Sequence, residues 1–126
     1  MTIRVLIVDD DVTVRRTLAR AFSRQPDFKV VGEAADGEEA LVLTAEESPD
    51  VIVMDVQMPK LSGLEATLRL RSQGLDTPIL FLTADTTATT QDRRLGHVRL
   101  LLKAQATMAD TVGAARELSV GGIDPR

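Results

Sequence analysis

The chain has 126 residues, the length of one ordinary domain, and 44% of them are hydrophobic, which is enough to bury a single core. It has no cysteine, which excludes disulfides, thiolate metal sites and thiol catalysis, and its formal net charge of −4 disfavours binding of nucleic acid. No apolar run approaches the roughly 18–20 residues of a membrane-spanning helix, and together with the lack of cysteine this indicates a globular protein of the cytoplasm.

Apolar runs alternate with helical patterns along the first half of the chain. Short runs of consecutive apolar residues indicate strands buried on both faces, whereas apolar residues three or four positions apart indicate helices. Pro26 and Ser48-Pro49 end the two helices of this half, and Asp36 is placed to cap the second one. In chain order we expect a strand over 3–8, a helix through Val14, Leu18 and Phe22, a strand over 28–33, a helix through Leu41 and Ala45, and a strand over 51–54.

The second half continues this alternation after a loop that contains Pro59 and Gly63. The segment 85–95 is predicted as a helix, although it is rich in threonine and has few apolar anchors. Gly121-Gly122 ends the last helix, so we expect the folded domain over 1–120 and the start of a linker or C-terminal tail over 121–126. The expected elements are a helix through Leu64 and Leu68, a strand over 78–83, the helix over 85–95, a strand over 98–102, and a helix through Met108, Val112, Ala115 and Leu118.

Five strands that alternate with five helices predict an α/β fold. Such short strand–helix units require parallel pairing, and right-handed crossovers then give an open, doubly wound parallel sheet. Five strands favour the flavodoxin-like strand order 2-1-3-4-5 over the six-stranded dinucleotide-binding order. No G-x-G-x-x-G motif follows the first strand, which further disfavours a dinucleotide-binding enzyme.

Polar side chains stand at the carboxyl ends of four of these strands. Asp9 and Asp10 follow the first strand, Asp55 follows the third, Thr83 ends the fourth and Lys103 follows the fifth. In open α/β sheets, ligands bind outside the carboxyl ends of the strands, at the point where the strand order reverses. For the order 2-1-3-4-5 this point lies between strands one and three, so we expect the five side chains to converge on one crevice.

The chemistry of these side chains suits a phosphoryl group. Three carboxylates placed together repel one another and need a cation, and an oxygen-only set in a shallow crevice favours Mg²⁺. With an ammonium from Lys103 and a hydroxyl from Thr83, one carboxylate can act as the nucleophile and form an acyl phosphate. The largest group of basic residues is predicted instead to form the solvated face of the first helix: Arg15, Arg16, Arg20 and Arg24.

Five stretches carry a resemblance to a known family: VLIVDDD at 5–11, VVGEAADGEEAL at 30–41, PDVIVMDVQMPKLSGLEAT at 49–67, LFLTA at 80–84 and LLLK at 100–103. With them the chain resembles, over essentially its whole length, the receiver domain of bacterial two-component response regulators. The second and third stretches look most like the LuxR/NarL-type subfamily, whose receivers precede a helix-turn-helix output domain.

The resemblance implies a role for each residue of the crevice. Asp55 would accept a phosphoryl group from the phosphohistidine of a sensor histidine kinase. Asp10, Asp55 and the backbone carbonyl of Gln57 would bind Mg²⁺ directly, with Asp9 acting largely through water. Lys103 would pair with the phosphoryl group. The domain would then be no enzyme beyond its own phosphorylation and dephosphorylation.

The resemblance also implies a readout and partners. Thr83 would turn inward on phosphorylation and remodel the face made by the helix over 85–95, the strand over 98–102 and the last helix. We expect a homodimer through that face or through the first and last helices. A helix-turn-helix output domain outside this chain would serve transcriptional regulation, while this domain itself binds no nucleic acid and no membrane.

The chain departs from the family pattern after Thr83. Leu100 and Leu101 stand where the family usually has an aromatic switch residue, Ala104 follows the lysine where many members have proline, and the stretch up to Lys103 is slightly short. We therefore retain the alternative of an atypical receiver that acts as a phosphorylation-independent interaction or dimerisation module. An aspartate-nucleophile phosphatase is disfavoured, because Gln57 stands where such enzymes place a second acid.

Overall fold

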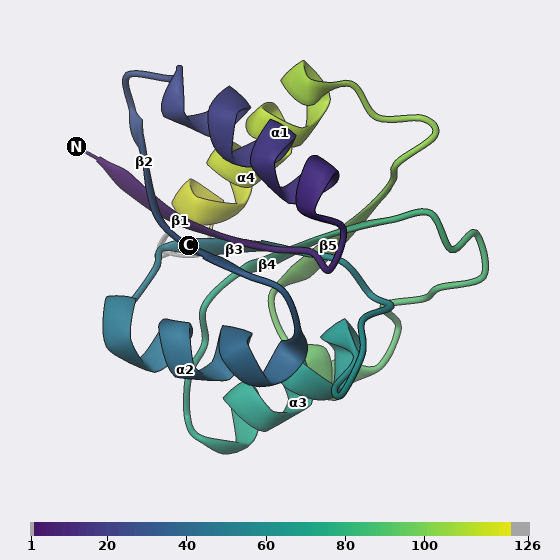
Figure 1. The fold of residues 1–126 in the computed structure, drawn as a ribbon. Helices are drawn as coiled ribbons and strands as arrows, with labels where there is room; N and C mark the ends of the chain where they lie inside the picture. Colours follow the sequence, from purple (N-terminus) through teal and green to yellow (C-terminus); the bar gives the residue numbers. More distant parts are fainter. Residues whose placement is uncertain (1, 122–126) are drawn as a thin grey trace.

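A computed structural model describes residues 2–121 of the protein. Within this range the strands form one parallel five-stranded sheet in the order β2-β1-β3-β4-β5, which confirms the predicted doubly wound, flavodoxin-like fold (Figure 1). In chain order the elements are β1 (Ile3–Val8), α1 (Val12–Ser23), β2 (Phe28–Ala34), α2 (Gly37–Glu47), β3 (Val51–Met54), α3 (Gly63–Ser72), β4 (Ile79–Thr83), the 3-10 helix η1 (Arg93–Leu95), β5 (Val98–Leu102) and α4 (Met108–Gly121).

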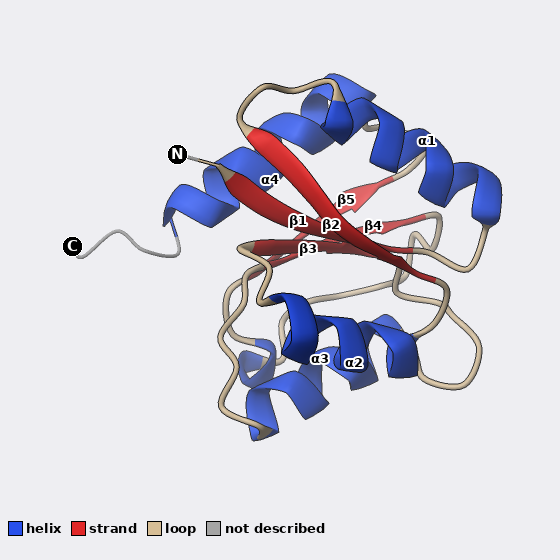
Figure 2. Ribbon diagram, turned by 60° about the vertical axis from the view of Figure 1, so that its left-hand side comes forward, coloured by secondary structure: helices blue, strands red, loops and turns tan. Residues whose placement is uncertain are grey.

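Helices cover both faces of the sheet, α1 and α4 on one side and α2 and α3 on the other (Figure 2). Because successive side chains of a strand point to opposite faces, each apolar run supplies two separate cores. In β1, Val5 and Ile7 pack with α1 and α4, whereas Leu6 and Val8 pack with α2 and α3. This two-sided burial is why the central strands are continuous apolar runs and not alternating ones.

The helices on the second face begin in close contact with neighbouring backbone. Asp36 caps α2 as predicted, accepting a hydrogen bond from the backbone N–H of Glu39 at 2.8 Å. A Cβ atom added to Gly37 would lie 2.4 Å from the carbonyl oxygen of Leu61, and one added to Gly63 would lie 2.1 Å from that of Asp55. Glycine at the start of α3 therefore lets the loop after β3 fold back against the strand that carries Asp55.

The prediction of an α-helix over 85–95, between the fourth and fifth strands, is wrong. The connection from β4 to β5 is a long loop that contains only the single turn η1 (Figure 1). Threonine is β-branched and fits a helix poorly, and Leu95 is the one fully buried hydrophobic residue of this segment. The end of the loop is held by Arg71 on α3, whose Nε donates to the carbonyl oxygen of Leu95 at 2.7 Å.

The predicted tail over 121–126 lies, apart from Gly121, outside the described residues, so the domain boundary stays a prediction. None of the helices in the described part of the chain has the length and apolar character needed to cross a membrane.

The close approach at Gly63 gives a test of the fold. We expect Gly63→Ala to lower the free energy of unfolding by about 1–3 kcal/mol, because the added methyl group must displace the backbone at Asp55. Gly113→Ala is the matched control: it lies inside α4 with nothing within 4 Å of its Cβ position, and should raise stability by about 0.5–1 kcal/mol. Urea unfolding followed by circular dichroism measures both. Equal effects of the two substitutions would contradict this account of the loop.

Candidate functional site

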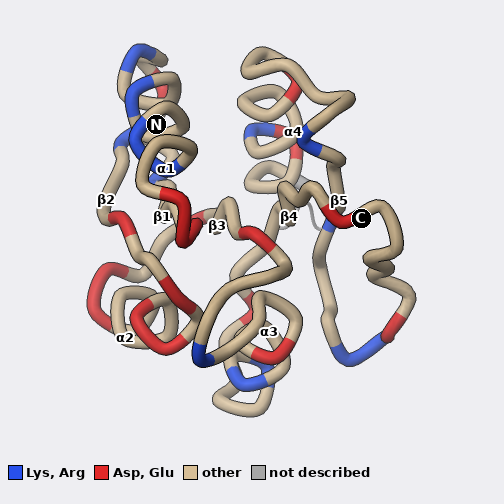
Figure 3. Tube along the Cα trace, turned by 45° about the vertical axis from the view of Figure 1, so that its right-hand side comes forward, with Lys and Arg blue, Asp and Glu red and all other residues tan. Residues whose placement is uncertain are grey.

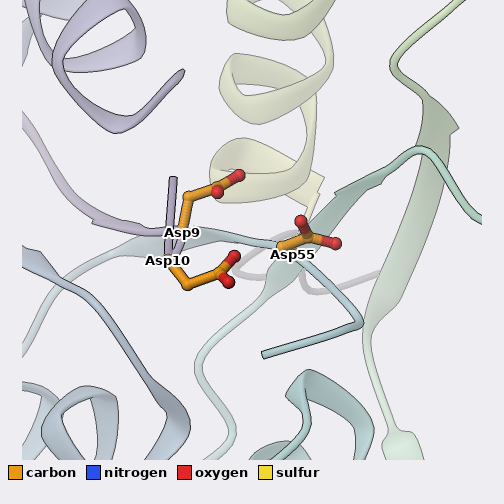
Figure 4. Close-up of side chains that lie close together, drawn as sticks. All are labelled: Asp9, Asp10 and Asp55. Carbon is orange, nitrogen blue, oxygen red and sulfur yellow. The ribbon is translucent and has the colours of Figure 1, made fainter. Parts of the chain in front are cut away.

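The carboxyl ends of β1 and β3 bring three carboxylates together. These strands pair in parallel with Val8 opposite Met54, so the residues that follow, Asp9 and Asp55, emerge side by side. One carboxylate oxygen from each of Asp9, Asp10 and Asp55 lies within 4.8 Å of the others (Figure 4). Figure 3 shows the same convergence as acidic segments after β1 and β3. Asp9 and Asp55 are only 1% and 8% exposed, whereas Asp10 faces solvent.

Lys103 reaches this cluster from the far edge of the sheet. Its backbone N–H donates to the carbonyl oxygen of Thr83 at 2.8 Å, which continues the pairing of β4 and β5 by one residue. Its side chain extends past β4, and Nζ lies 2.9 Å from Oδ2 of Asp9 and 2.9 Å from Oδ2 of Asp55. One ammonium therefore bridges two largely buried carboxylates that are distant in sequence.

Burial and charge act against each other in this cluster. Burial raises the pKa of Asp9, and the hydrogen bonds from Lys103 and from the N–H of Asp11 only partly offset it. Burial alone would lower the pKa of Lys103, but its hydrogen bonds to Asp9 and Asp55 outweigh burial and raise that pKa. Three carboxylates face one ammonium, so the ionised cluster has an excess of negative charge that a further cation can neutralise.

Thr83 and Gln57 border the cluster. Thr83 is buried at the end of β4, and its Oγ1 accepts a hydrogen bond from the N–H of Asp85 at 3.1 Å. The backbone N–H of Gln57 donates to Oδ1 of Asp55 at 3.2 Å, which keeps the loop after β3 close to that carboxylate. The side chains that the sequence analysis placed at strand ends thus gather at the carboxyl ends of the strands. Their roles in binding and catalysis remain predictions.

The structure adds two residues that sequence reasoning missed. Arg15 was expected on the solvated face of α1, but it is half-buried: its Nη1 donates to the carbonyl oxygen of Asp9 at 2.8 Å and its Nε lies 3.3 Å from Glu33. Asp85 accepts a hydrogen bond from Nε2 of Gln57 at 3.0 Å. The inward position of Arg15 could have been predicted from the helical period, because Arg15 follows Val14 and lies next to the apolar stripe of α1. Nothing in the sequence indicates a contact between Asp85 and Gln57.

Comparison with known proteins identifies what this arrangement is similar to. Residues 5–111 match the family model of the response regulator receiver domain. Response regulator MprA of Mycolicibacterium vanbaalenii is 51% identical over 84 residues, which cover 67% of this chain and 36% of MprA. Transcriptional regulatory protein LiaR of Bacillus subtilis is 41% identical over 117 residues, which cover 90% of this chain and 56% of LiaR. The chain thus spans between about a third and just over half of these relatives.

Solved structures agree with the sequence comparison. The response regulator domain of Thermotoga maritima CheB superposes with a TM-score of 0.84 at 30% identity, covering 99% of this chain and all of that one. A LuxR-family two-component response regulator from Aurantimonas sp. SI85-9A1 superposes with a TM-score of 0.83 at 31% identity, covering 96% of this chain and 87% of that one.

The charge imbalance of the cluster predicts opposite effects of two substitutions on stability. In metal-free buffer at neutral pH, Asp10→Asn should raise the free energy of unfolding by about 0.5–1 kcal/mol, because it removes an exposed charge from an overly negative cluster. Lys103→Met should lower it by about 1–3 kcal/mol, because two carboxylates lose their shared partner. Thermal unfolding in a chelator measures both, and a stabilising Lys103→Met would contradict the bridging role of the ammonium.

Proposed function

The chain belongs to the family of response regulator receiver domains, and on that premise we propose that it accepts a phosphoryl group on Asp55. The observation that carries the proposal is the position of the Lys103 ammonium, 2.9 Å from both Asp55 and Asp9. Of the two carboxylates that it contacts, Asp55 is the more exposed, at 8% against 1% for Asp9. It is therefore the carboxylate that an incoming phosphorus atom reaches more readily.

Each residue of the site has a separate role in the proposed phosphoryl transfer. A carboxylate oxygen of Asp55 attacks the phosphorus of a phosphohistidine on a sensor histidine kinase. The new O–P bond forms as the P–N bond breaks, and its electron pair stays on the imidazole nitrogen. Lys103 donates to one phosphoryl oxygen and the Thr83 hydroxyl to another, so developing charge is stabilised by groups already in place.

The oxygen donors present fit a hard divalent cation. Asp9, Asp10 and Asp55 offer only carboxylate oxygens, and no histidine or cysteine is among the ligand groups gathered there in residues 2–121. We propose that Asp10, Asp55 and the backbone carbonyl of Gln57 hold Mg²⁺, with Asp9 acting through water. When bound, Mg²⁺ would neutralise phosphoryl oxygens and the excess negative charge of the cluster.

The partners follow from the same proposal. A sensor histidine kinase would supply the phosphoryl group, and phosphorylation would control a homodimer or an output domain. LiaR is a transcriptional regulatory protein and is longer than this chain, so we propose a helix-turn-helix DNA-binding domain and a role in transcription for the whole protein. The cytoplasm is the compartment that we propose for it.

Phosphorylation can be tested directly by intact mass after incubation with Mg²⁺ and acetyl phosphate. The wild type should gain one phosphoryl group, and Asp55→Asn or a chelator should abolish the gain. Asp50→Asn is the matched control. Asp50 directly precedes β3 and Asp55 directly follows it, so the two carboxylates lie at opposite ends of the same strand. An unmodified wild type, or an equal adduct on Asp55→Asn, would overturn the proposal.

One observation favours the alternative of a phosphorylation-independent interaction module. The connection between β4 and β5 has no α-helix, and β5 carries Leu100 and Leu101 where an aromatic switch residue was expected. Small-angle scattering with and without beryllofluoride and Mg²⁺ separates the two functions. A switch changes its mass or its radius of gyration with the mimic, whereas a module keeps the same oligomer in both conditions.

A further inference from the structure

The loop after β4 is attached to the loop after β3 by a side-chain contact. The Nε2 of Gln57 donates to Oδ2 of Asp85 at 3.0 Å. The other oxygen, Oδ1, accepts from the backbone N–H of Thr87 at 2.9 Å and from its hydroxyl at 2.6 Å. Asp85 is thus held from both sides, although the segment to which it belongs has no α-helix to support it.

This contact closes a ring of five hydrogen bonds around the crevice. Asp55 accepts from the N–H of Gln57 (3.2 Å), Gln57 donates to Asp85 (3.0 Å), and the N–H of Asp85 donates to Oγ1 of Thr83 (3.1 Å). The carbonyl of Thr83 accepts from the N–H of Lys103 (2.8 Å), and Nζ of Lys103 donates to Asp55 (2.9 Å). Four of the five bonds involve backbone or the charged cluster, and the Gln57–Asp85 bond is the side-chain link that joins the two loops.

We propose that the Gln57–Asp85 hydrogen bond positions two groups of the site at once: the backbone carbonyl of Gln57, which is proposed to hold Mg²⁺, and the hydroxyl of Thr83, which is proposed to bind the phosphoryl group. The proposal rests on the proposed function of the site. Gln57 and Asp85 are positioning residues in it, because neither side chain needs to touch the phosphoryl group.

The arrangement of donors and acceptors supports this role. Since Oγ1 of Thr83 accepts the N–H of Asp85, the proton of its own hydroxyl is free to point to a different acceptor. The Asp85 carboxylate stabilises the turn that contains this N–H. Its Oδ1 accepts from the N–H of Thr87, and its Oδ2 accepts from Nε2 of Gln57. Groups held in place before binding lose less conformational freedom when the ligand arrives, so a pre-formed ring favours binding.

Asp85 also carries a charge that acts in the opposite direction. The hydroxyl and N–H of Thr87, followed by the Gln57 amide, hold the pKa of Asp85 below its usual value, so it is ionised at neutral pH. An ionised carboxylate repels an incoming anion, although its exposure to solvent screens the repulsion. A test of positioning must therefore separate the loss of the hydrogen bond from the loss of the charge.

Binding of beryllofluoride in the presence of Mg²⁺, followed by titration calorimetry, makes that separation. Gln57→Ala keeps the charge and breaks the bond, and should weaken binding about three- to tenfold, as expected for the loss of one exposed hydrogen bond of ordinary net strength. Asp85→Ala and Asp85→Asn remove the same charge, but asparagine can still bond to the Gln57 amide, so Asp85→Ala should bind about three- to tenfold more weakly than Asp85→Asn. In the Asp85→Ala background, Gln57→Ala should then change affinity less than about twofold.

Asp92→Ala is the matched control on the same loop. Asp92 accepts a hydrogen bond from the N–H of Arg94, two residues later, just as Asp85 accepts one from the N–H of Thr87. The partner of Asp92 lies in η1, however, and not in the loop that contains Gln57. Affinity should stay at the wild-type level in this variant. Equal weakening by Asp92→Ala, unchanged affinity in Gln57→Ala, or multiplying effects in the double variant would each overturn the positioning role.

A measurement without ligand reports on the ring itself. Hydrogen exchange of the Asp85 amide should be about tenfold faster in Gln57→Ala than in the wild type and unchanged in Asp92→Ala, while the thermal midpoint of each variant shows that the fold is kept. If the wild type binds no beryllofluoride, the proposed function fails and the positioning role fails with it. If the wild type binds and the variants bind equally well, only the positioning role fails.

Discussion

The site depends on one ammonium held between two buried carboxylates. Lys103 can bridge Asp9 and Asp55 only because the strand order places β1 and β3 side by side and leaves only β4 between β3 and β5. Burying carboxylates is unfavourable unless they are paired, and a single lysine does not match the charge of all three. When ionised, the cluster therefore has an excess of negative charge that a further cation can neutralise.

The backbone of the loop after β3 is tightly packed next to the carboxylate cluster. The loop after β3 returns so closely to its own strand that Gly63 leaves no room for a Cβ beside the carbonyl of Asp55, and the Gly63 N–H donates to the carbonyl of Val56 at 2.7 Å. This contact fixes where α3 begins and keeps the loop next to the carboxylate. Packing on the second face of the sheet and geometry at the site are therefore set by the same residues.

The connection between β4 and β5 distinguishes this receiver domain from the pattern that its sequence suggested. Without an α-helix, the loop is held by polar contacts near its two ends: Asp85 with Gln57 at the start, and Leu95 with Arg71 at the end. Leu95 adds one buried apolar anchor. A loop held by a few hydrogen bonds and one buried leucine opens locally at a lower free-energy cost than a packed helix.

The five strands, their order and the gathering of five polar side chains at the carboxyl ends of the strands could be predicted from sequence patterns alone: Asp9, Asp10, Asp55, Thr83 and Lys103. This was possible because apolar runs indicate buried parallel strands, and the carboxyl ends of parallel strands lie on the same side of the sheet. Three contacts became visible only in the folded molecule: Lys103 bonds both Asp9 and Asp55, Arg15 donates to the carbonyl of Asp9, and Asp85 accepts from Gln57. The loop over 85–95 is a further difference, because too few of its side chains bury apolar surface to offset the poor helix propensity of threonine. Local patterns specify strands and their ends, whereas contacts between residues far apart in the chain depend on side-chain reach and burial, which no local pattern contains.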